Sequence, residues 1–321
     1  MVKFRWLKLS QYNFSQLQGS KMRYLHKKIW YEDQEGVRAF FIKKLVESGR
    51  DFDVIDGNIL CLDLVGVPAL VAHMDTVNDR AMKNKMVYDK KTDRLTRKNA
   101  ILGADDKAGV QIIHDLFDQC NFILTRDEEV GLLGARSLAS MTYVADKLEE
   151  IEVPCLLEFD RMGNSDIVGP WNEYCCEELA DDISAISGGA YNPEMGVCTD
   201  LDELKDLGVE GVNLSVGYYQ QHTKNEYMVM AEFENACKLA ELLLVELADR
   251  DYSFQTAPPK KDDYSWGHSG SFYSDKEIEN CYYCGVELEG EEKDTGTCWG
   301  CETWHKDTIK EAKTINVKAV K

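Results

Sequence analysis

The chain has 321 residues, 44% of them hydrophobic, and a formal net charge of −20 at pH 7. This length and composition predict one large globular domain with room for a small appendage. The excess of acidic residues argues against a nucleic-acid partner, because nucleic acids attract basic surfaces. Residues 1–50 alone are basic, with eleven Lys and Arg against four Asp and Glu. We interpret that segment as a solvated helical face, although it could still contact an acidic partner.

Neither a signal peptide nor a membrane span is indicated. The first residues, MVKFRWLKLSQYNF, alternate charged and apolar side chains, and no later apolar run reaches the length of a membrane span. We therefore expect a cytoplasmic protein with no membrane partner. Seven of the eleven cysteines lie in apolar or helical context, as reduced thiols would, and the other four have the spacing of metal ligands.

Strand and helix patterns alternate along most of the chain. Short apolar runs predict buried strands at 68–73, 120–125, 153–159 and 211–217. Amphipathic runs predict helices at 36–48, 108–119, 131–141 and 231–250. This alternation predicts an α/β fold, with an open, mostly parallel sheet covered by helices on both faces.

The character of the sequence changes after Arg250, where adjacent prolines, charges, Ser and Gly replace the periodic pattern. We place the main domain at residues 1–252 and a linker at 253–274. A cysteine-containing module follows at 275–310, and a tail at 311–321.

Each predicted strand runs into residues that can bind a metal. Open α/β sheets place their ligands at the carboxyl ends of the strands, so these side chains should meet at one edge of the sheet. Histidine and carboxylate ligands together are the set that two adjacent zinc ions require. The residues concerned are His73, Asp75, Asp105, Glu128, Glu129, Asp160 and His222.

Each of these residues also has a simpler interpretation. Asp105 can favour a helix start, His73 can be a core histidine, and Glu128 and Glu129 can begin a solvated helix. Thr223 and Glu226 match a capping box, which would need no ligand at His222. Taken together, however, these interpretations leave several polar groups at the ends of buried strands without compensation, which is unfavourable unless a metal is bound.

Five segments, taken in chain order, carry a resemblance to a known family. The segments HMDTV, GADDKAG, DEEVGLLGA, EFDRMGNSDIV and GYYQQHTKNE span about residues 55–245. They resemble the co-catalytic di-zinc exopeptidases, which include peptidase T, glutamate carboxypeptidase and the zinc aminopeptidases. The resemblance implies a zinc-peptidase-like fold in which His73, Asp105 and Asp160 hold one zinc. It implies that Asp105, Glu129 and His222 hold the other, with Asp105 as the bridge.

The resemblance also implies roles for residues beside the metals. Glu128 would be the general base, and Asp75 would orient the His73 imidazole. The chemistry agrees, because a metal-bound histidine usually donates its other ring N–H to a carboxylate, and the attacking water needs a base. We expect Lys107 at the surface or behind the ligands rather than in catalysis, and we expect Asp200 to be an ordinary helix cap.

Two intervals limit the resemblance. Only 29 residues separate Asp75 from Asp105, and 61 separate Asp160 from His222. Neither interval has room for the large lid domain of many relatives, so we predict a catalytic domain without a lid, as in the single-domain aminopeptidases.

The C-terminal cysteines form two Cys-x2-Cys pairs separated by 13 residues, close to the spacing of zinc ribbons. Cys281, Cys284, Cys298 and Cys301 would close a tetrahedral shell around one structural zinc, and His305 could replace one of them. Two disulfides are the alternative. The acidic surroundings argue against nucleic-acid binding, so the module would pack on the main domain or bind a protein partner.

These features predict a zinc-dependent hydrolase that acts on short peptides, with two catalytic zinc ions and one structural zinc. We favour an aminopeptidase-type exopeptidase, because an acidic domain attracts a free amino terminus and repels a carboxylate. The alternatives are a deacylase or other amidohydrolase, or a non-catalytic binding protein that keeps the fold. An intact Glu128 argues against the last, because a binding module needs no base.

Overall fold

The computed structural model describes residues 25–252 except 78, 171, 173 and 197. Its helices are α1 (Lys27–Trp30), α2 (Gln34–Ser48), α3 (Ala104–Asp115), α4 (Leu133–Ala139), α5 (Thr142–Glu150), α6 (Glu177–Ile186), α7 (Asp200–Leu204) and α8 (Met230–Glu246). Its strands are β1 (Asp53–Ile55), β2 (Asn58–Cys61), β3 (Ala69–His73), β4 (Met86–Asp89), β5 (Arg94–Arg97), β6 (Asn121–Thr125), β7 (Leu156–Arg161), β8 (Asp166–Val168), β9 (Asn192–Pro193), β10 (Gly211–Ser215), β11 (Tyr218–Tyr219) and β12 (Tyr227–Val229).

Local sequence signals explain where the helices begin and end. At the start of α2, the side chain of Asp33 accepts a hydrogen bond from the Gly36 N–H (2.9 Å). At its end, Gly49 takes the left-handed conformation (φ 73°) that terminates many helices. The α2 side chains Val37, Phe41 and Leu45 recur at helical spacing and are fully buried.

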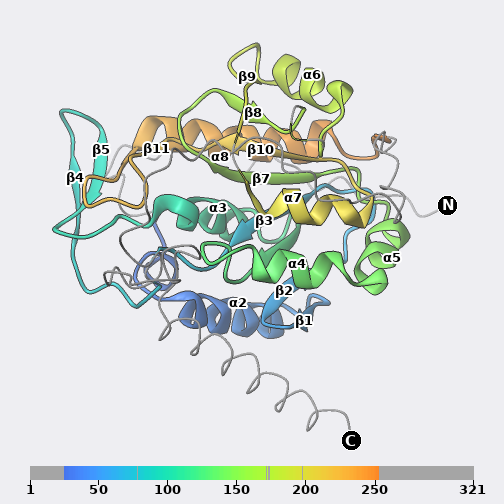
Figure 1. Cartoon of the computed structure of the whole chain (residues 1–321), viewed down its shortest axis with the longest axis horizontal. Helices are drawn as coiled ribbons and strands as arrows, with labels where there is room; N and C mark the ends of the chain where they lie inside the picture. The colour runs from blue at the N-terminus through green and yellow to red at the C-terminus, as the bar shows by residue number, and fades with distance from the viewer. Residues whose placement is uncertain (1–24, 78, 171, 173, 197, 253–321) are drawn as a thin grey trace, which may run out of the picture. The chain divides into compact units, whose positions relative to one another are not determined.

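The main sheet has the strand order β1-β2-β6-β3-β7-β10-β8-β9 (Figure 1). Its centre is parallel, because β6, β3, β7 and β10 run in the same direction, and every residue of β3, β6 and β10 is buried. Antiparallel strands β2 and β8 extend it on either side. The four predicted strands are thus confirmed as the parallel centre of the sheet.

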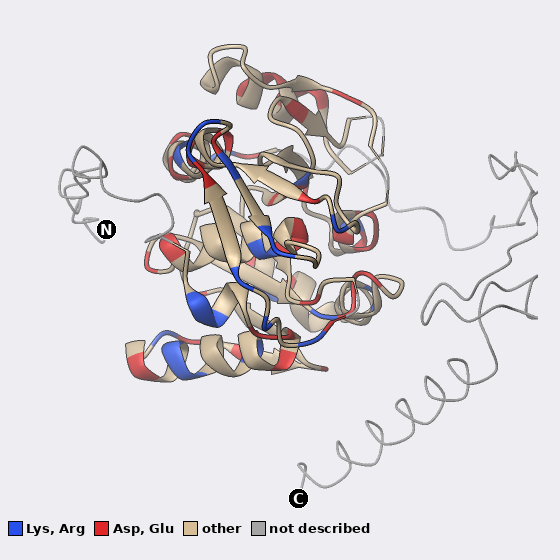
Figure 2. Ribbon diagram, turned by 90° about the vertical axis from the view of Figure 1, so that its left-hand side faces the viewer, with Lys and Arg blue, Asp and Glu red and all other residues tan. Residues whose placement is uncertain are grey.

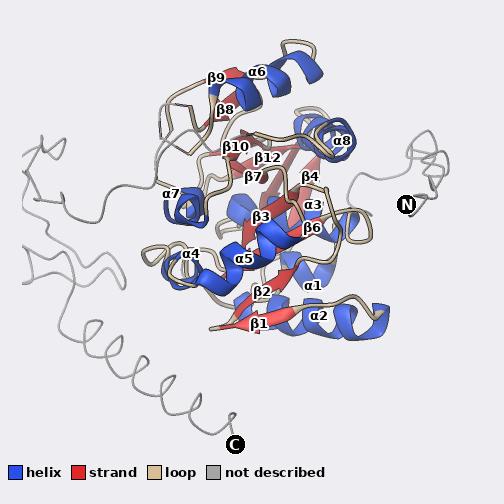
Figure 3. Cartoon of the chain, turned by 90° about the vertical axis from the view of Figure 1, so that its right-hand side faces the viewer, coloured by secondary structure: helices blue, strands red, loops and turns tan. Residues whose placement is uncertain are grey.

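Helices cover both faces of the main sheet, as predicted. Figure 3 shows α4 and α7 on one side of the sheet and α3 and α8 on the other. The buried apolar side chains of both layers form one continuous core with the strands. A doubly covered α/β sheet leaves its strand ends as the place where polar side chains can gather.

The segment between β3 and α3 contains the β4–β5 hairpin, which joins β12 and β11 in a second, four-stranded sheet. Lys and Arg residues are frequent in and next to this hairpin, and Figure 2 colours their positions on the ribbon blue; they include Lys85, Lys90, Lys91, Arg94 and Lys98. No helix among the described residues has the length and hydrophobicity needed to cross a membrane.

Candidate metal centre

The parallel strands bring the predicted ligands to one edge of the main sheet. Val71 of β3 pairs with Ile123 of β6 on one side and with Glu158 of β7 on the other. His73 and Asp160 each lie two residues further along these strands, so they stand side by side at the carboxyl ends of β3 and β7. The His73 Nε2 atom lies 3.6 Å from an Asp160 carboxylate oxygen, and the His73 side chain is completely buried.

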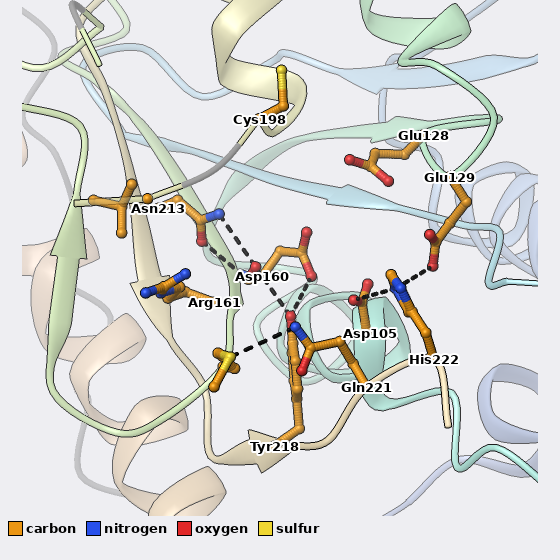
Figure 4. Close-up of a pocket in the computed structure, with 13 residues that line it drawn as sticks. Asp105, Glu128, Glu129, Asp160, Arg161, Cys198, Asn213, Tyr218, Gln221 and His222 are labelled. Carbon is orange, nitrogen blue, oxygen red and sulfur yellow. Dashed lines mark hydrogen bonds and ion pairs between the residues drawn. The ribbon is translucent and has the colours of Figure 1, made fainter. Parts of the chain in front are cut away.

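Asp105 lies between two histidines. Its Oδ1 atom is 3.0 Å from His73 Nε2, and its Oδ2 atom is 3.1 Å from His222 Nε2. His222 Nε2 is also 3.2 Å from Glu129 Oε1 (Figure 4). One carboxylate therefore presents one oxygen to each of two ligand groups, as a carboxylate that bridges two ions must do.

Asp75 holds the loop that carries both glutamates. Its Oδ1 atom accepts the Glu128 N–H and its Oδ2 atom accepts the Glu129 N–H, each at 3.1 Å. The Oδ1 atom also lies 3.3 Å from Nδ1 of His73, the ring nitrogen that faces away from Asp105. A single buried carboxylate thus sets the direction of an imidazole and of two neighbouring glutamates.

Asp106 is a buried part of this cluster that the sequence did not indicate. Its Oδ2 atom accepts the His73 backbone N–H (3.3 Å) and its Oδ1 atom accepts the Gly109 N–H (2.8 Å). A Cβ atom at position 109 would lie 2.6 Å from the Asp106 carboxylate, so only glycine fits there. Backbone groups thus engage both Asp106 oxygens, whereas both Asp105 oxygens face histidine nitrogens.

The cluster holds more negative than positive groups. Burial, together with the charges of Asp200, Asp160 and Asp105, raises the pKa of Glu128 to about 9, although His73 opposes this shift. Burial and Asp105 likewise raise the pKa of Asp160 to about 7. Carboxyl groups packed this closely resist simultaneous ionisation, and cations placed among them would offset that repulsion.

The donor set fits zinc. Neutral imidazoles and carboxylates are ordinary zinc ligands, and sites that hold catalytic zinc keep some coordination positions open. His73, Asp105 and Glu129 place one donor atom each within 4.8 Å of one another, and so do His73, Asp106 and Asp160.

The surface position considered for Lys107 and the cap predicted for Asp200 are wrong. Lys107 is 1% exposed and its Nζ donates to the Met74 carbonyl. The cap of α7 is Thr199, and the completely buried Asp200 carboxylate instead accepts the Thr125 hydroxyl. Both side chains lie behind the cluster, where sequence patterns that assume exposed charges do not place them.

A cavity of about 120 Å³ opens beside the cluster. Figure 4 shows Glu128, Asp105, Asp160 and His222 around it. The Tyr218 hydroxyl donates to the Asp160 carboxylate (3.1 Å), which fixes that side chain on the cavity wall. Farther from the histidines, the lining includes Arg161, Met162, Val168, Gly196 and Cys198. The four cysteines of the predicted ribbon, and His305, lie outside the described residues.

Solved structures with the same fold include several peptidases. A tripeptidase from Staphylococcus aureus matches with a TM-score of 0.57 and 16% identity, over 72% of this chain and 99% of that one. The aminopeptidase PepT from Bacillus cereus matches at 0.54 and 17%, over 70% and 97% of the two chains. Aminopeptidase APDkam598 from Desulfurococcus kamchatkensis matches at 0.52 and 15%, over 71% and 96%.

No protein-family model and no curated protein matches the sequence. At these identities the structural likeness concerns the fold, and it confirms the predicted zinc-peptidase-like α/β architecture of the main domain. The chemistry has to be argued from the site itself.

Proposed function

We propose that the chain is a two-metal aminopeptidase that hydrolyses short peptides. The observation that carries the proposal is Asp105, with one oxygen toward His73 and the other toward His222. In this proposal His73, Asp105 and Asp160 hold one zinc, and Asp105, Glu129 and His222 hold the other. When bound, a zinc pair supplies Lewis-acid chemistry that activates a water and polarises a carbonyl.

Glu128 is the proposed general base. Its backbone is fixed by Asp75, and its carboxylate lies on the cavity wall, 3.9 Å from His73 Nε2. From this position Glu128 takes a proton from the attacking water and passes it to the leaving amine.

The charges around the cavity favour attack at the amino end of a peptide. Four carboxylates line it, and Arg161 is the only Lys or Arg among its described lining residues. The Arg161 Nε already donates to Asp166 (3.0 Å), so its charge is partly balanced. Three of the four carboxylates are proposed zinc ligands, and bound zinc would offset their charge. The preference for a free ammonium group over a free carboxylate therefore rests on Glu128 and on the acidic chain as a whole, whose net charge is −20.

The test compares three forms of one short peptide: unmodified, acetylated at the amino terminus and amidated at the carboxyl terminus. We expect the full-length, zinc-loaded protein to cleave the unmodified and amidated forms at similar rates and not to cleave the acetylated form. A Glu128→Gln preparation made in parallel controls for contaminating peptidases. Cleavage of the unmodified and acetylated forms but not of the amidated form would point to a carboxypeptidase, and removal of the acetyl group would point to a deacylase.

A further inference from the structure

Glu226 is a buried carboxylate with no part in the proposed ligand set. It is 2% exposed. Its Oε2 atom accepts the Gly103 N–H at 2.9 Å, and its Oε1 atom accepts the Ala104 N–H at 2.7 Å. The capping box considered for Thr223 and Glu226 does not form, because the glutamate side chain reaches a loop more than a hundred residues away in the chain instead of turning back.

The loop that Glu226 holds leads directly into Asp105. Gly103 precedes α3 in a left-handed conformation (φ 75°) and has no side chain with which to cap this end. The backbone at Asp105 and Asp106 is not helical, so the usual helix hydrogen bonds do not fix the direction of the two carboxylates. Glu226 instead holds the two N–H groups directly before them, those of Gly103 and Ala104.

The same glutamate belongs to the loop that carries His222. Its own N–H donates to the Thr223 carbonyl (3.1 Å), one residue after His222. The His222 side chain is 47% exposed, and its ring contacts Asp105 and Glu129, both proposed metal ligands. Within the described structure, Glu226 therefore connects the backbone of the His222 loop to the backbone of the Asp105 loop.

Basic residues surround this connection. Arg94, Arg97 and Lys224 line a groove that also contains Glu226. Arg97 is 2% exposed and its guanidinium donates to the Leu102 carbonyl, next to Gly103. A buried negative charge is tolerated here because backbone donors and nearby cations compensate it.

We propose that Glu226 is a positioning residue that sets the separation of Asp105 and His222, and thereby the affinity of the metal position that these two residues share. The proposal rests on the proposed function only in placing a metal between them. It does not require that the substrate be a peptide.

The experiment titrates the chelator-treated full-length protein with Co²⁺ and Zn²⁺, using calorimetry for both and the visible spectrum for Co²⁺. Glu226→Ala should weaken the affected position about 10- to 100-fold, the range typical for residues that support metal ligands. Glu226→Gln keeps the shape and one acceptor, so its loss should be smaller. Circular dichroism of each variant reports whether the domain is folded.

Glu210→Gln is the matched control. Glu210 is also 2% exposed and accepts a backbone N–H, that of Cys176 (2.6 Å), but it lies just before β10, at the opposite end of that strand from the cluster. We expect this variant to bind both metals like the wild type. Wild-type affinity in Glu226→Ala, or an equal loss in Glu210→Gln, would overturn the positioning role.

Turnover provides a separate readout. Peptidase activity of Glu226→Gln should recover toward the wild-type kcat as zinc is raised, with KM little changed, because the defect lies in metal occupancy. Failure to recover at full occupancy would contradict the proposal. The two proposals can fail separately. If Glu226→Ala binds metal more weakly than the wild type, but the wild type cleaves no peptide, the aminopeptidase proposal fails and the positioning role stands.

Discussion

The two ends of the central strands differ in how their charged side chains are balanced: they are paired at the amino end, and carboxylates are in excess at the carboxyl end. At the amino end of β6, Arg50 is 10% exposed and pairs with Asp63 through two nitrogens, with Nε–Oδ2 at 3.2 Å. Its guanidinium also donates to the carbonyls of Phe117 and Cys120. At the carboxyl end, Asp105, Asp160 and their neighbours have too few cations to balance them.

Asn121, at the amino end of β6, shows the same difference in hydrogen bonding. The Asn121 side chain at the start of β6 accepts the N–H groups of Asp63 and Leu64 and donates to the carbonyls of Leu64 and Val67. Every hydrogen-bonding group of that side chain is therefore used within the chain. At the other end of the sheet, one oxygen each of Glu158 and Asp200 is buried without a hydrogen-bond partner. A self-satisfied polar cluster supports the fold, whereas buried oxygens without hydrogen-bond partners carry a cost that the fold alone does not offset.

Substituting one aspartate at each end, Asp105 or Asp63, is the most direct test of this difference. Asp105→Ala removes the proposed bridge, so we expect loss of both cluster metals and of turnover by ~10³-fold or more. Asp63→Ala, the matched change at the other end, should lower the melting temperature and leave metal content and turnover per folded molecule intact. Metal analysis of both variants checks this. Full metal occupancy in Asp105→Ala would place the bridge elsewhere.

Glu128→Gln separates catalysis from metal binding. The amide keeps the shape of the side chain and cannot accept the proton, so turnover should fall by ~10²-fold or more while both cluster metals stay bound. Steady-state kinetics on a zinc-saturated sample, paired with metal analysis of the same sample, measure the two effects together. Wild-type turnover at full occupancy would eliminate Glu128 as the base.

Arg50→Met tests the structural end. It leaves the partly buried Asp63 carboxylate without its cation, and we expect the free energy of unfolding to fall by about 3 kcal/mol. Adding Asp63→Leu should recover much of that loss, because an apolar pair no longer buries a charge. Urea denaturation measures both values. Turnover of the folded single variant should match the wild type, and a metal-dependent defect there would contradict the separation of the two ends.

The features that could be predicted from the sequence are those with a local signal in it. Strands at 68–73, 120–125, 153–159 and 211–217 were visible because a buried parallel strand is an uninterrupted apolar run. His73, Asp105 and His222 could be singled out because each stands in a short local motif. Strand β1 carries no comparable run, whereas the apolar run at 59–62, in and after β2, is buried in the same way and was not singled out.

Asp106, Lys107, Asp200 and Glu226 show what the sequence could not supply. Each is a charged side chain that the fold buries, against the usual preference of such residues for the surface. Their partners come from other segments, as when Glu226 binds the backbone before α3. Local periodicity carries no record of such distant contacts, so only the folded chain reveals them.

The smallest expected effect on catalysis concerns the C-terminal cysteines. A thiolate shell is a third kind of polar cluster, satisfied by one ion with no position left for water. Cys281→Ser with Cys284→Ser should therefore remove one zinc per chain and expose the module to limited proteolysis, since that ion would supply most of its folding energy. Cys237→Ser, at a partly buried thiol of α8, should leave the zinc content unchanged.

Much of the peptidase activity should survive the double substitution, because none of the proposed catalytic ligands is a cysteine. Unchanged zinc content in the double variant would contradict the ribbon, and loss of activity at full cluster occupancy would tie the module to catalysis.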